Sequence, residues 1–460
     1  MANAFHVDAA VAAHRFGLGE ATLAAPGSDP QGWLLAQIGP ADAPRGDALL
    51  TTPQALALLQ AEAEKRRQAR NPPPGMTAEQ LLGGHYREVT IADARSRLLS
   101  AATTQRPFAE RLHLFWANHF TVSLAKGSVR GLVGAFERDA IRPNIAGSFE
   151  QLLVAATTHP AMLRYLDNVL SAGPHSRVVA RAARRAQQMQ EGPRLTGLNE
   201  NLAREILELH TLGVNGGYAQ ADVTSFAAVL TGWRVAALAS GSGQPFDPAW
   251  HEPGRKTVLG KTYPEGPEAL RQVLHDLAHH PSTARFLATK LARHFVADDP
   301  PPALVERLAA TFTHSEGQLS EVYRELVRHP SAWDPAPVKL KTPEEFVVSS
   351  ARLLGLPERA FERHDGAGII ALGQRLHAAP SPAGWPDRAE EWLGPEAVWK
   401  RVEWSARVAD RVGRALDARA LASASLGPRL SDTSRRQIER AADGPQALAL
   451  LLMAPEFQRR

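Results

Sequence analysis

Residues 197–213 read Gly-Leu-Asn-Glu-Asn-Leu-Ala-Arg-Glu-Ile-Leu-Glu-Leu-His-Thr-Leu-Gly. Apolar side chains recur at helical spacing along this stretch, and Gly213 stands where a glycine commonly ends a helix. Asn199 suits the N-cap position because its side-chain oxygen can accept a backbone N–H. The stretch therefore predicts a helix from about Glu200 to Leu212.

The rest of the chain has the same helical character. Ala, Leu, Arg and Glu are prominent, and alternating runs of β-branched residues are few. We predict a mainly α fold, a single large multi-helix domain over residues 1–460. Irregular excursions are expected at residues 171–197 and 239–265, with a short β-hairpin in the second, where Pro253-Gly254 favours a turn. Helices are expected over residues 54–70, 106–120, 266–297, 302–313, 318–329 and 342–354, and a final helical part begins near Pro395.

The composition is that of a globular protein with little excess charge. Lys and Arg number 52 against 48 Asp and Glu, so the formal net charge is only +4. Nucleic-acid binding is not expected, because the one dense basic stretch, Arg177 to Arg185, lacks the aromatic residues that stack on bases. No stretch approaches the ~18 apolar residues of a membrane span. The chain is thus expected to be soluble.

Cysteine is absent. Thiolate metal sites and cysteine nucleophiles are thereby excluded, and any divalent metal cofactor would have to be held by Glu, Asp or His. The sequence does not reveal whether there is a cofactor. The first residues lack the basic and apolar regions of a signal peptide, so a cytoplasmic location is expected, and export together with a partner stays open.

One face of the predicted helix at 199–213 is polar. At about 100° per residue, one arc of roughly 140° holds Glu200, Asn201, Arg204, Glu205 and Glu208. A solvated face with weak ion pairs is the first interpretation. The second is a cleft in which Glu205 and Glu208 act as acid, base or hard-metal ligands. Candidate substrate-binding residues on this segment are Asn199, Asn201 and Arg204.

A second, aromatic-rich helix is expected over residues 106–120. His119 projects on its apolar side, where a buried ring needs a partner such as Asp167. A structural polar network is one interpretation of these two residues, and catalysis is the other. Glu110 and His113 have the i,i+3 spacing of metal ligands in helical bundles, but that pattern is common by chance.

Further candidates lie in turns and loops. Asn215-Gly-Gly217 permits a sharp reversal that delivers Tyr218 beside the next helix. His251 and Lys256 stand in the second excursion, where ionisable side chains are often exposed or functional. One interpretation of Tyr218, His251 and Lys256 is that they bind substrate. The alternative is tight helix packing for Tyr218 and simple solvent exposure for His251 and Lys256. Gly384-Trp-Pro-Asp387 indicates a turn that could border a pocket.

Several short segments of the sequence follow one another in a characteristic order. They are Phe115-Trp-Ala-Asn-His-Phe120, Met162-Leu-Arg-Tyr-Leu-Asp-Asn168, Asn199-Glu-Asn-Leu-Ala-Arg-Glu205, Glu208-Leu-His-Thr-Leu-Gly213, Gly216-Gly-Tyr218 and Leu230-Thr-Gly-Trp233. With these strings the chain resembles the bacterial family catalogued as domain of unknown function 1800. Weaker matches extend the resemblance over nearly the whole chain. The resemblance implies a mainly helical fold and brings no established catalytic residues.

The resemblance also implies a partner, because members are commonly encoded beside a second family, domain of unknown function 1501, which resembles sulfatases and phosphatases. Two hypotheses therefore stand. The chain is either an enzyme with a carboxylate and histidine cleft built around helix 199–213, or a non-catalytic partner or assembly protein for a sulfatase-like neighbour. It departs from the family pattern at Ala219, where a capping Thr is expected, and at Glu252, where an Asp is usual.

Overall fold

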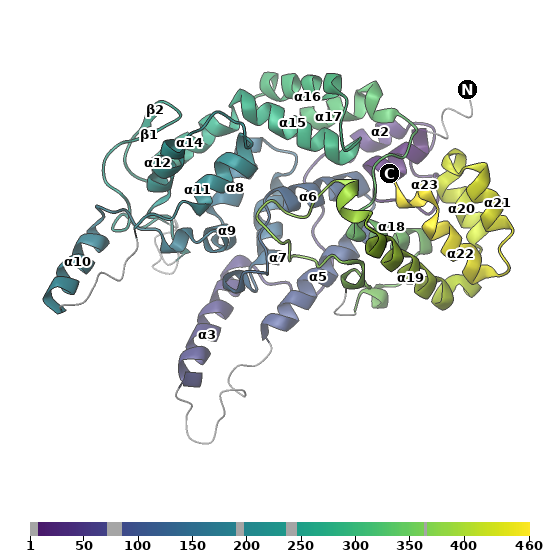
Figure 1. The fold of residues 1–460 in the computed structure, drawn as a ribbon, viewed down its shortest axis with the longest axis horizontal. Coiled ribbons are helices and arrows are strands. Elements are labelled where there is room, and N and C mark those ends of the chain that lie inside the picture. The colour runs from purple at the N-terminus through teal and green to yellow at the C-terminus, as the bar shows by residue number, and fades with distance from the viewer. Residues whose placement is uncertain (1–7, 71–84, 190–196, 236–245, 363–365) are drawn as a thin grey trace.

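The computed structural model describes residues 8–70, 85–189, 197–235, 246–362 and 366–460 (Figure 1). These residues form a mainly α fold with one two-stranded antiparallel hairpin, as predicted. Parts of both predicted excursions, residues 190–196 and 239–245, lie outside the described residues.

The first half of the chain contributes helices α2 (Pro30–Leu35), α3 (Thr52–Arg70), α5 (His85–Thr103), α6 (Pro107–His119), α7 (Val133–Phe136), α8 (Phe149–Thr158), α9 (Pro160–Tyr165), α10 (Arg177–Met189), α11 (Asn201–Glu205) and α12 (Gln220–Leu230). The hairpin strands and the helices after them are β1 (Lys256–Val258), β2 (Lys261–Tyr263), α14 (Pro267–Ala278), α15 (Pro281–Phe295), α16 (Pro302–His314) and α17 (Leu319–Arg328). The C-terminal helices are α18 (Pro343–Leu354), α19 (Pro395–Val412), α20 (Ala418–Leu426), α21 (Asp432–Glu439), α22 (Gly444–Met453) and α23 (Pro455–Gln458).

Buried apolar side chains form two clusters. The larger one holds Trp116 of α6 and Phe149 of α8 and continues through α12 and α14 to α17. The smaller one is built by α18 to α22 together with Leu98 of α5. Helices α5 and α6 lie between the two groups of helices in Figure 1. Charged side chains at this junction line the site described below.

A short chain of hydrogen bonds fixes the centre of the larger cluster. Trp116 Nε1 donates to the Tyr323 hydroxyl at 2.6 Å, and that hydroxyl donates to the Ile145 carbonyl at 2.6 Å. Trp116 and Tyr323 are fully buried, and burial raises the pKa of Tyr323. The phenol therefore stays neutral, and both polar groups are satisfied inside the core.

The structure corrects three local predictions. Residues 177–189 of the first excursion are not irregular but form α10, because Ala, Arg and Gln favour a helix. The predicted hairpin is confirmed, but its turn falls at Leu259-Gly260, where φ is +49° and +76°, and not at Pro253-Gly254. The helix expected over 266–297 is interrupted at His280-Pro281, where α15 begins.

His-Pro pairs begin several helical segments. The Nδ1 atoms of His159, His280 and His329 each accept the backbone N–H two residues later, at 3.1, 3.1 and 3.3 Å. A ring nitrogen that accepts must be unprotonated, so these caps require neutral histidine at that atom. Burial lowers the pKa of His159 to about 4, and the nearby Asp139 opposes this shift only in part.

We expect the His159 cap to make stability depend on pH. The unfolded chain takes up this proton near pH 6.5, whereas the folded chain takes it up only near pH 4. The stability gained from the neutral ring is thus fully present above about pH 6.5 and is lost as the pH falls, by up to about 1.4 kcal/mol per pH unit. In His159→Asn, whose amide oxygen can keep the cap, urea unfolding between pH 7 and 5 should show a correspondingly shallower slope. An unchanged slope would contradict the assignment.

Candidate functional site

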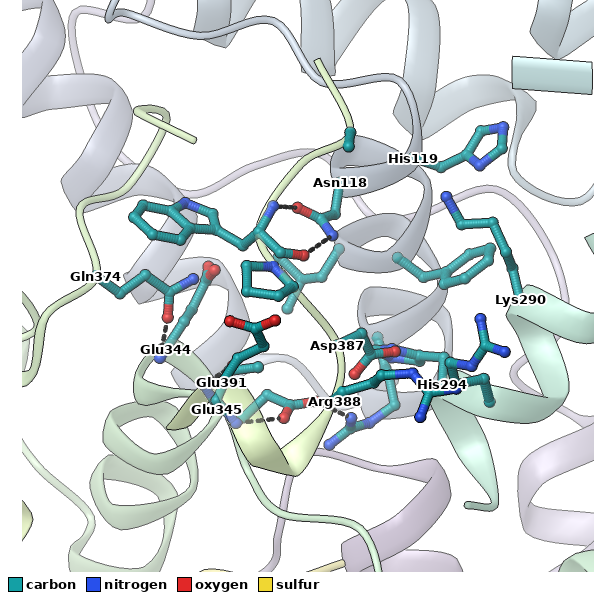
Figure 2. Close-up of a pocket in the computed structure, with 18 of the residues that line it drawn as sticks. Asn118, His119, Lys290, His294, Glu344, Glu345, Gln374, Asp387, Arg388 and Glu391 are labelled. Carbon is teal, nitrogen blue, oxygen red and sulfur yellow. Dashed lines mark hydrogen bonds and ion pairs between the residues drawn. The ribbon is translucent and has the colours of Figure 1, made fainter. Parts of the chain in front are cut away.

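A pocket of about 310 Å³ lies among α6, α15, the start of α18 and the loop at residues 374–391 (Figure 2). Its lining gathers ionisable side chains, namely Arg97, Arg111, His119, Lys290, Arg293, His294, Glu344, Glu345, Asp387, Arg388 and Glu391. A larger hollow of about 580 Å³ beside α5 has arginines but no carboxylate or histidine in its lining. The smaller pocket is therefore the better candidate for acid–base chemistry.

The amide of Asn118 holds one wall of the pocket in place. Its Oδ1 accepts the Trp385 backbone N–H at 2.8 Å, and its Nδ2 donates to the Trp385 carbonyl at 2.9 Å (Figure 2). Gly384, before Trp385, has φ +87°, and a Cβ there would lie 2.5 Å from the Asn118 carbonyl oxygen. Only glycine fits this approach. The turn expected to border a pocket does so, and it delivers Asp387.

His294 and Asp387 form a hydrogen-bonded pair in the wall. His294 Nδ1 lies 2.9 Å from Asp387 Oδ2. Burial lowers the pKa of His294, although Asp387 opposes the shift, so the ring is neutral near pH 7. Burial would raise the pKa of Asp387, but His294, Lys339 and Arg460 lower it to about 2. An ionised Asp387 can only accept, so the His294 proton sits on Nδ1 and leaves Nε2 with a lone pair.

No side chain among the described residues hydrogen bonds to His294 Nε2, although that atom is buried. The same holds for two other pocket residues, at His119 Nδ1 and Trp385 Nε1. Buried polar atoms are nearly always paired in folded proteins, with protein, water or ligand. Ordered water or a bound polar molecule would satisfy these three atoms in the folded protein.

Lys290 stands one helical turn before His294 on α15. Burial lowers its pKa to about 8, and Asp387 opposes the shift. Its side chain extends toward His119 (Figure 2), and its charge, after burial itself, helps to hold the pKa of His119 well below the usual value. Within the described part of the chain Lys290 makes no ion pair, and its Nζ lies 5.5 Å from the centre of the Phe286 ring. It is thus a cation, mostly protonated near pH 7, whose charge is not balanced by an adjacent carboxylate.

The carboxylates at the base of the pocket are already paired. Glu345 accepts from Arg111 and lies 3.0 Å from Arg460, and Glu344 lies 2.5 Å from Arg97. Burial would raise the pKa of Glu345, but the two arginines hold it far below its ordinary range. These carboxylates therefore shape the pocket as fixed anions and do not act as free bases.

A model of the family described as "Protein of unknown function (DUF1800)" matches residues 11–459. The chain belongs to this family. No curated protein and no solved structure is detectably similar to it. Of the helices that the structure describes, none is both long and apolar enough to span a bilayer. The matched region of this DUF1800 chain includes every residue that lines the pocket.

Of the predicted catalytic residues, His119 alone lines the pocket. Its Nε2 lies 3.1 Å from the carbonyl oxygen of His210, which ties α6 to the predicted helix at 199–213. Asp167 instead pairs with Lys126 outside the pocket, and its backbone has φ +58°. The structure thus does not bring His119 and Asp167 together.

The predicted helix at 199–213 changes its winding halfway. Residues 201–205 are α-helical, but Ile206–Thr211 form a π-helical turn, in which the Leu212 N–H donates to the Leu207 carbonyl five residues earlier. A projection at 100° per residue therefore no longer applies beyond Glu205. π-Turns are rare and frequent at functional sites. His210 lies within this turn, fully buried, with neither ring nitrogen hydrogen bonded within the described residues.

Glu205 and Glu208 remain neighbours on this segment. Burial raises the pKa of Glu205, and the charge of Glu208 adds to the shift. The Tyr218 hydroxyl donates to Glu208 at 3.3 Å, so Tyr218, a predicted substrate-binding residue, lies beside these carboxylates. None of the three residues lines the pocket.

The remaining predicted binding residues are engaged in intramolecular contacts. Asn199 Oδ1 accepts the Asn201 backbone N–H at 3.0 Å, and Arg204 pairs with Glu200 at 3.1 Å. These contacts fit the interpretation of a solvated, ion-paired helix start. Asn199, Asn201 and Arg204 thus hold the start of this helix in place and do not line the pocket.

His251 and Lys256 are buried together at a distance from the pocket. His251 Nδ1 donates to the Thr231 carbonyl at 2.7 Å, and its Nε2 lies 3.1 Å from Lys256 Nζ. Burial lowers the pKa of both side chains. Glu110 and His113, whose i,i+3 spacing is that of metal ligands, are not free to bind a metal in this way. Arg142 donates to both carboxylate oxygens of Glu110, at 2.6 and 2.8 Å.

Lys290 and His294 were missed by sequence reasoning. Their i,i+4 spacing on one helix was a usable signal, but the same spacing describes any solvated helix face. Only the contact with Asp387, nearly a hundred residues later in the chain, distinguishes a functional pair from an ordinary solvated helix face.

Proposed function

We propose that the pocket is an active site for general-base chemistry on a small anionic substrate. The observation that supports this proposal is the neutral His294 ring, oriented by an ionised Asp387, one helical turn from the unpaired ammonium of Lys290. A base whose proton-accepting nitrogen is free and a cation that can hold an anion are the parts such a reaction requires.

The roles follow from the chemistry of each group. His294 Nε2 takes a proton from the substrate or from a substrate-bound water, and Asp387 stabilises the imidazolium that results. Lys290 binds the anionic group and offsets the negative charge that develops on deprotonation. Thr342 is the one hydroxyl side chain in the lining, and it accepts the Glu345 backbone N–H at 3.3 Å.

This proposal keeps the carboxylate and histidine cleft expected from the sequence but moves its centre. His119 belongs to both, whereas Asp387 and His294 take the roles that were predicted for Glu205 and Glu208. The segment at 199–213 would contribute through the backbone of His210, which contacts His119. Substrate binding would then restrain α6 and the π-turn together.

We expect ¹⁵N-detected NMR at pH 7 to show His294 as the neutral tautomer protonated at Nδ1. In Asp387→Asn, the pKa values of both His294 and Lys290 should fall further, because Asp387 raises both. Asp299→Asn is the matched control, since this exposed carboxylate pairs with Arg388 at 3.1 Å at the pocket's edge and should change neither value. A His294 ring protonated at Nε2 would overturn the assignment of the base.

A second candidate function is that of a partner protein, and α10 favours it. This helix carries Arg177, Arg181, Arg184 and Arg185, no acidic residue and no buried side chain, and it projects from the body (Figure 1). An exposed basic helix attracts an acidic surface, with a strength that falls as salt rises. The partner would be the sulfatase-like protein of the family domain of unknown function 1501 that the resemblance implied.

Co-purification with the product of such a neighbouring gene tests this second function. We expect retention at low salt that is lost in Arg181→Glu/Arg184→Glu and kept in Arg66→Glu/Arg67→Glu, which makes the same charge change on the exposed helix α3. Equal retention of both variants, or a monomer that turns over substrate without the neighbour, would contradict the partner role.

A further inference from the structure

Glu150, His275 and His279 come together where α8 and α14 pack, away from the pocket. One potential ligand atom from each lies within 4.8 Å of the others, and no other such His, Asp and Glu group occurs among the described residues. None of the three was a candidate in the sequence. We propose that they form a binding site for a divalent transition-metal ion, with Zn²⁺ as the fitting probe.

The three side chains already face one another. His275 Nδ1 lies 2.9 Å from Glu150 Oε2, and the rings of His275 and His279 have centroids 4.4 Å apart. The two histidines are four residues apart at the end of α14, the spacing that places paired ligands on one helix face. Only small side-chain movements are needed to bring three ligands to one ion.

A backbone contact prepares His279 as a ligand. Its Nδ1 lies 2.8 Å from the His275 carbonyl oxygen, which can only accept, so the proton sits on Nδ1 and Nε2 keeps its lone pair. Metal-bound histidines usually donate their other ring N–H to a carbonyl or carboxylate in this way, which fixes the ring orientation. The arrangement therefore supplies the outer contact of a metal ligand before the metal arrives.

The local charge also favours a cation. His275 lies in the last turn of α14 and His279 caps it, where the helix dipole is negative. Glu150 adds a carboxylate, and the adjacent Asp276 is engaged by Lys261 at 2.6 Å and by Tyr263 at 2.6 Å. The neighbouring acid thus supports the fold of the hairpin and leaves Glu150 as the carboxylate ligand.

Two nitrogens and one carboxylate oxygen suit Zn²⁺, whose open sites commonly have three protein ligands and a water. Such an ion would join α8 to α14. The residue before Glu150 is Phe149, whose ring lies 5.8 Å from that of Trp116 in the main core. Metal binding is therefore expected to raise the stability of the core that supports α6, since a ligand that binds only the folded state stabilises it.

The test uses untagged full-length protein, freed of metal by a chelator. Titration calorimetry with Zn²⁺ should show one equivalent bound, and saturating Zn²⁺ should raise the thermal unfolding midpoint. Both effects should be lost in His279→Gln and strongly weakened in Glu150→Gln. Co²⁺ should give the visible absorption of a four-coordinate ion in the wild type but not in His279→Gln.

His314→Gln is the matched control. His314 also lies at a helix end, and its Nδ1 contacts the backbone carbonyl of Ala310 at 2.7 Å, but no second histidine or carboxylate completes a group there within the described residues. This variant should bind Zn²⁺ like the wild type. Absence of binding to the wild type, or equal binding by His279→Gln, would overturn the proposal. The outcome is independent of the pocket, which shares none of these residues.

Discussion

The buried carboxylate of Glu345 is the constraint on which the junction of the two cores depends. It lies between Arg111 of α6 and Arg460, and all three side chains are almost completely shielded from solvent. A buried charge without its partners costs several kcal/mol, so the three residues must stay together. Arg111 also donates to the Gly17 carbonyl at 2.6 Å. One ionic cluster thereby links the N-terminal segment, α6, α18 and the last residue.

The same cluster sets the chemistry of the pocket. Arg460 donates to the backbone carbonyl of His294, and with Lys339 it keeps Asp387 ionised. Asp387 in turn determines which nitrogen of His294 is free. The pocket is thus a consequence of packing two helical cores across buried ions. Replacement of buried ion clusters by well-packed apolar residues is often neutral or stabilising in proteins, so a buried ionic junction beside a pocket is a reason to look for function here.

Much of the fold could be predicted from the sequence, because amphipathic spacing and Pro and Gly punctuation mark α3, α6 and α16 to α18, whereas the break between α14 and α15 at Pro281 was missed. The helix at 199–213 was predicted, but its π-turn was not, since one extra residue per turn leaves no local signature. The candidate site was harder to predict. His119 and the turn at Gly384 carried signals, whereas His294 gains its role only from Asp387, a tertiary contact that spacing along one helix cannot reveal. The group at Glu150 was missed for the same reason, because α8 and α14 are far apart in sequence.

The central claim is that the pocket beside Lys290 and His294 takes up a small anion. Crystallographic screening of small carboxylates and phosphates against the wild type and Lys290→Met tests it most directly. Ligands are expected between the Lys290 ammonium and the His294 ring in the wild type, and they should be lost in the variant. Ligands found only in the larger, arginine-lined hollow beside α5, or unchanged by Lys290→Met, would contradict it.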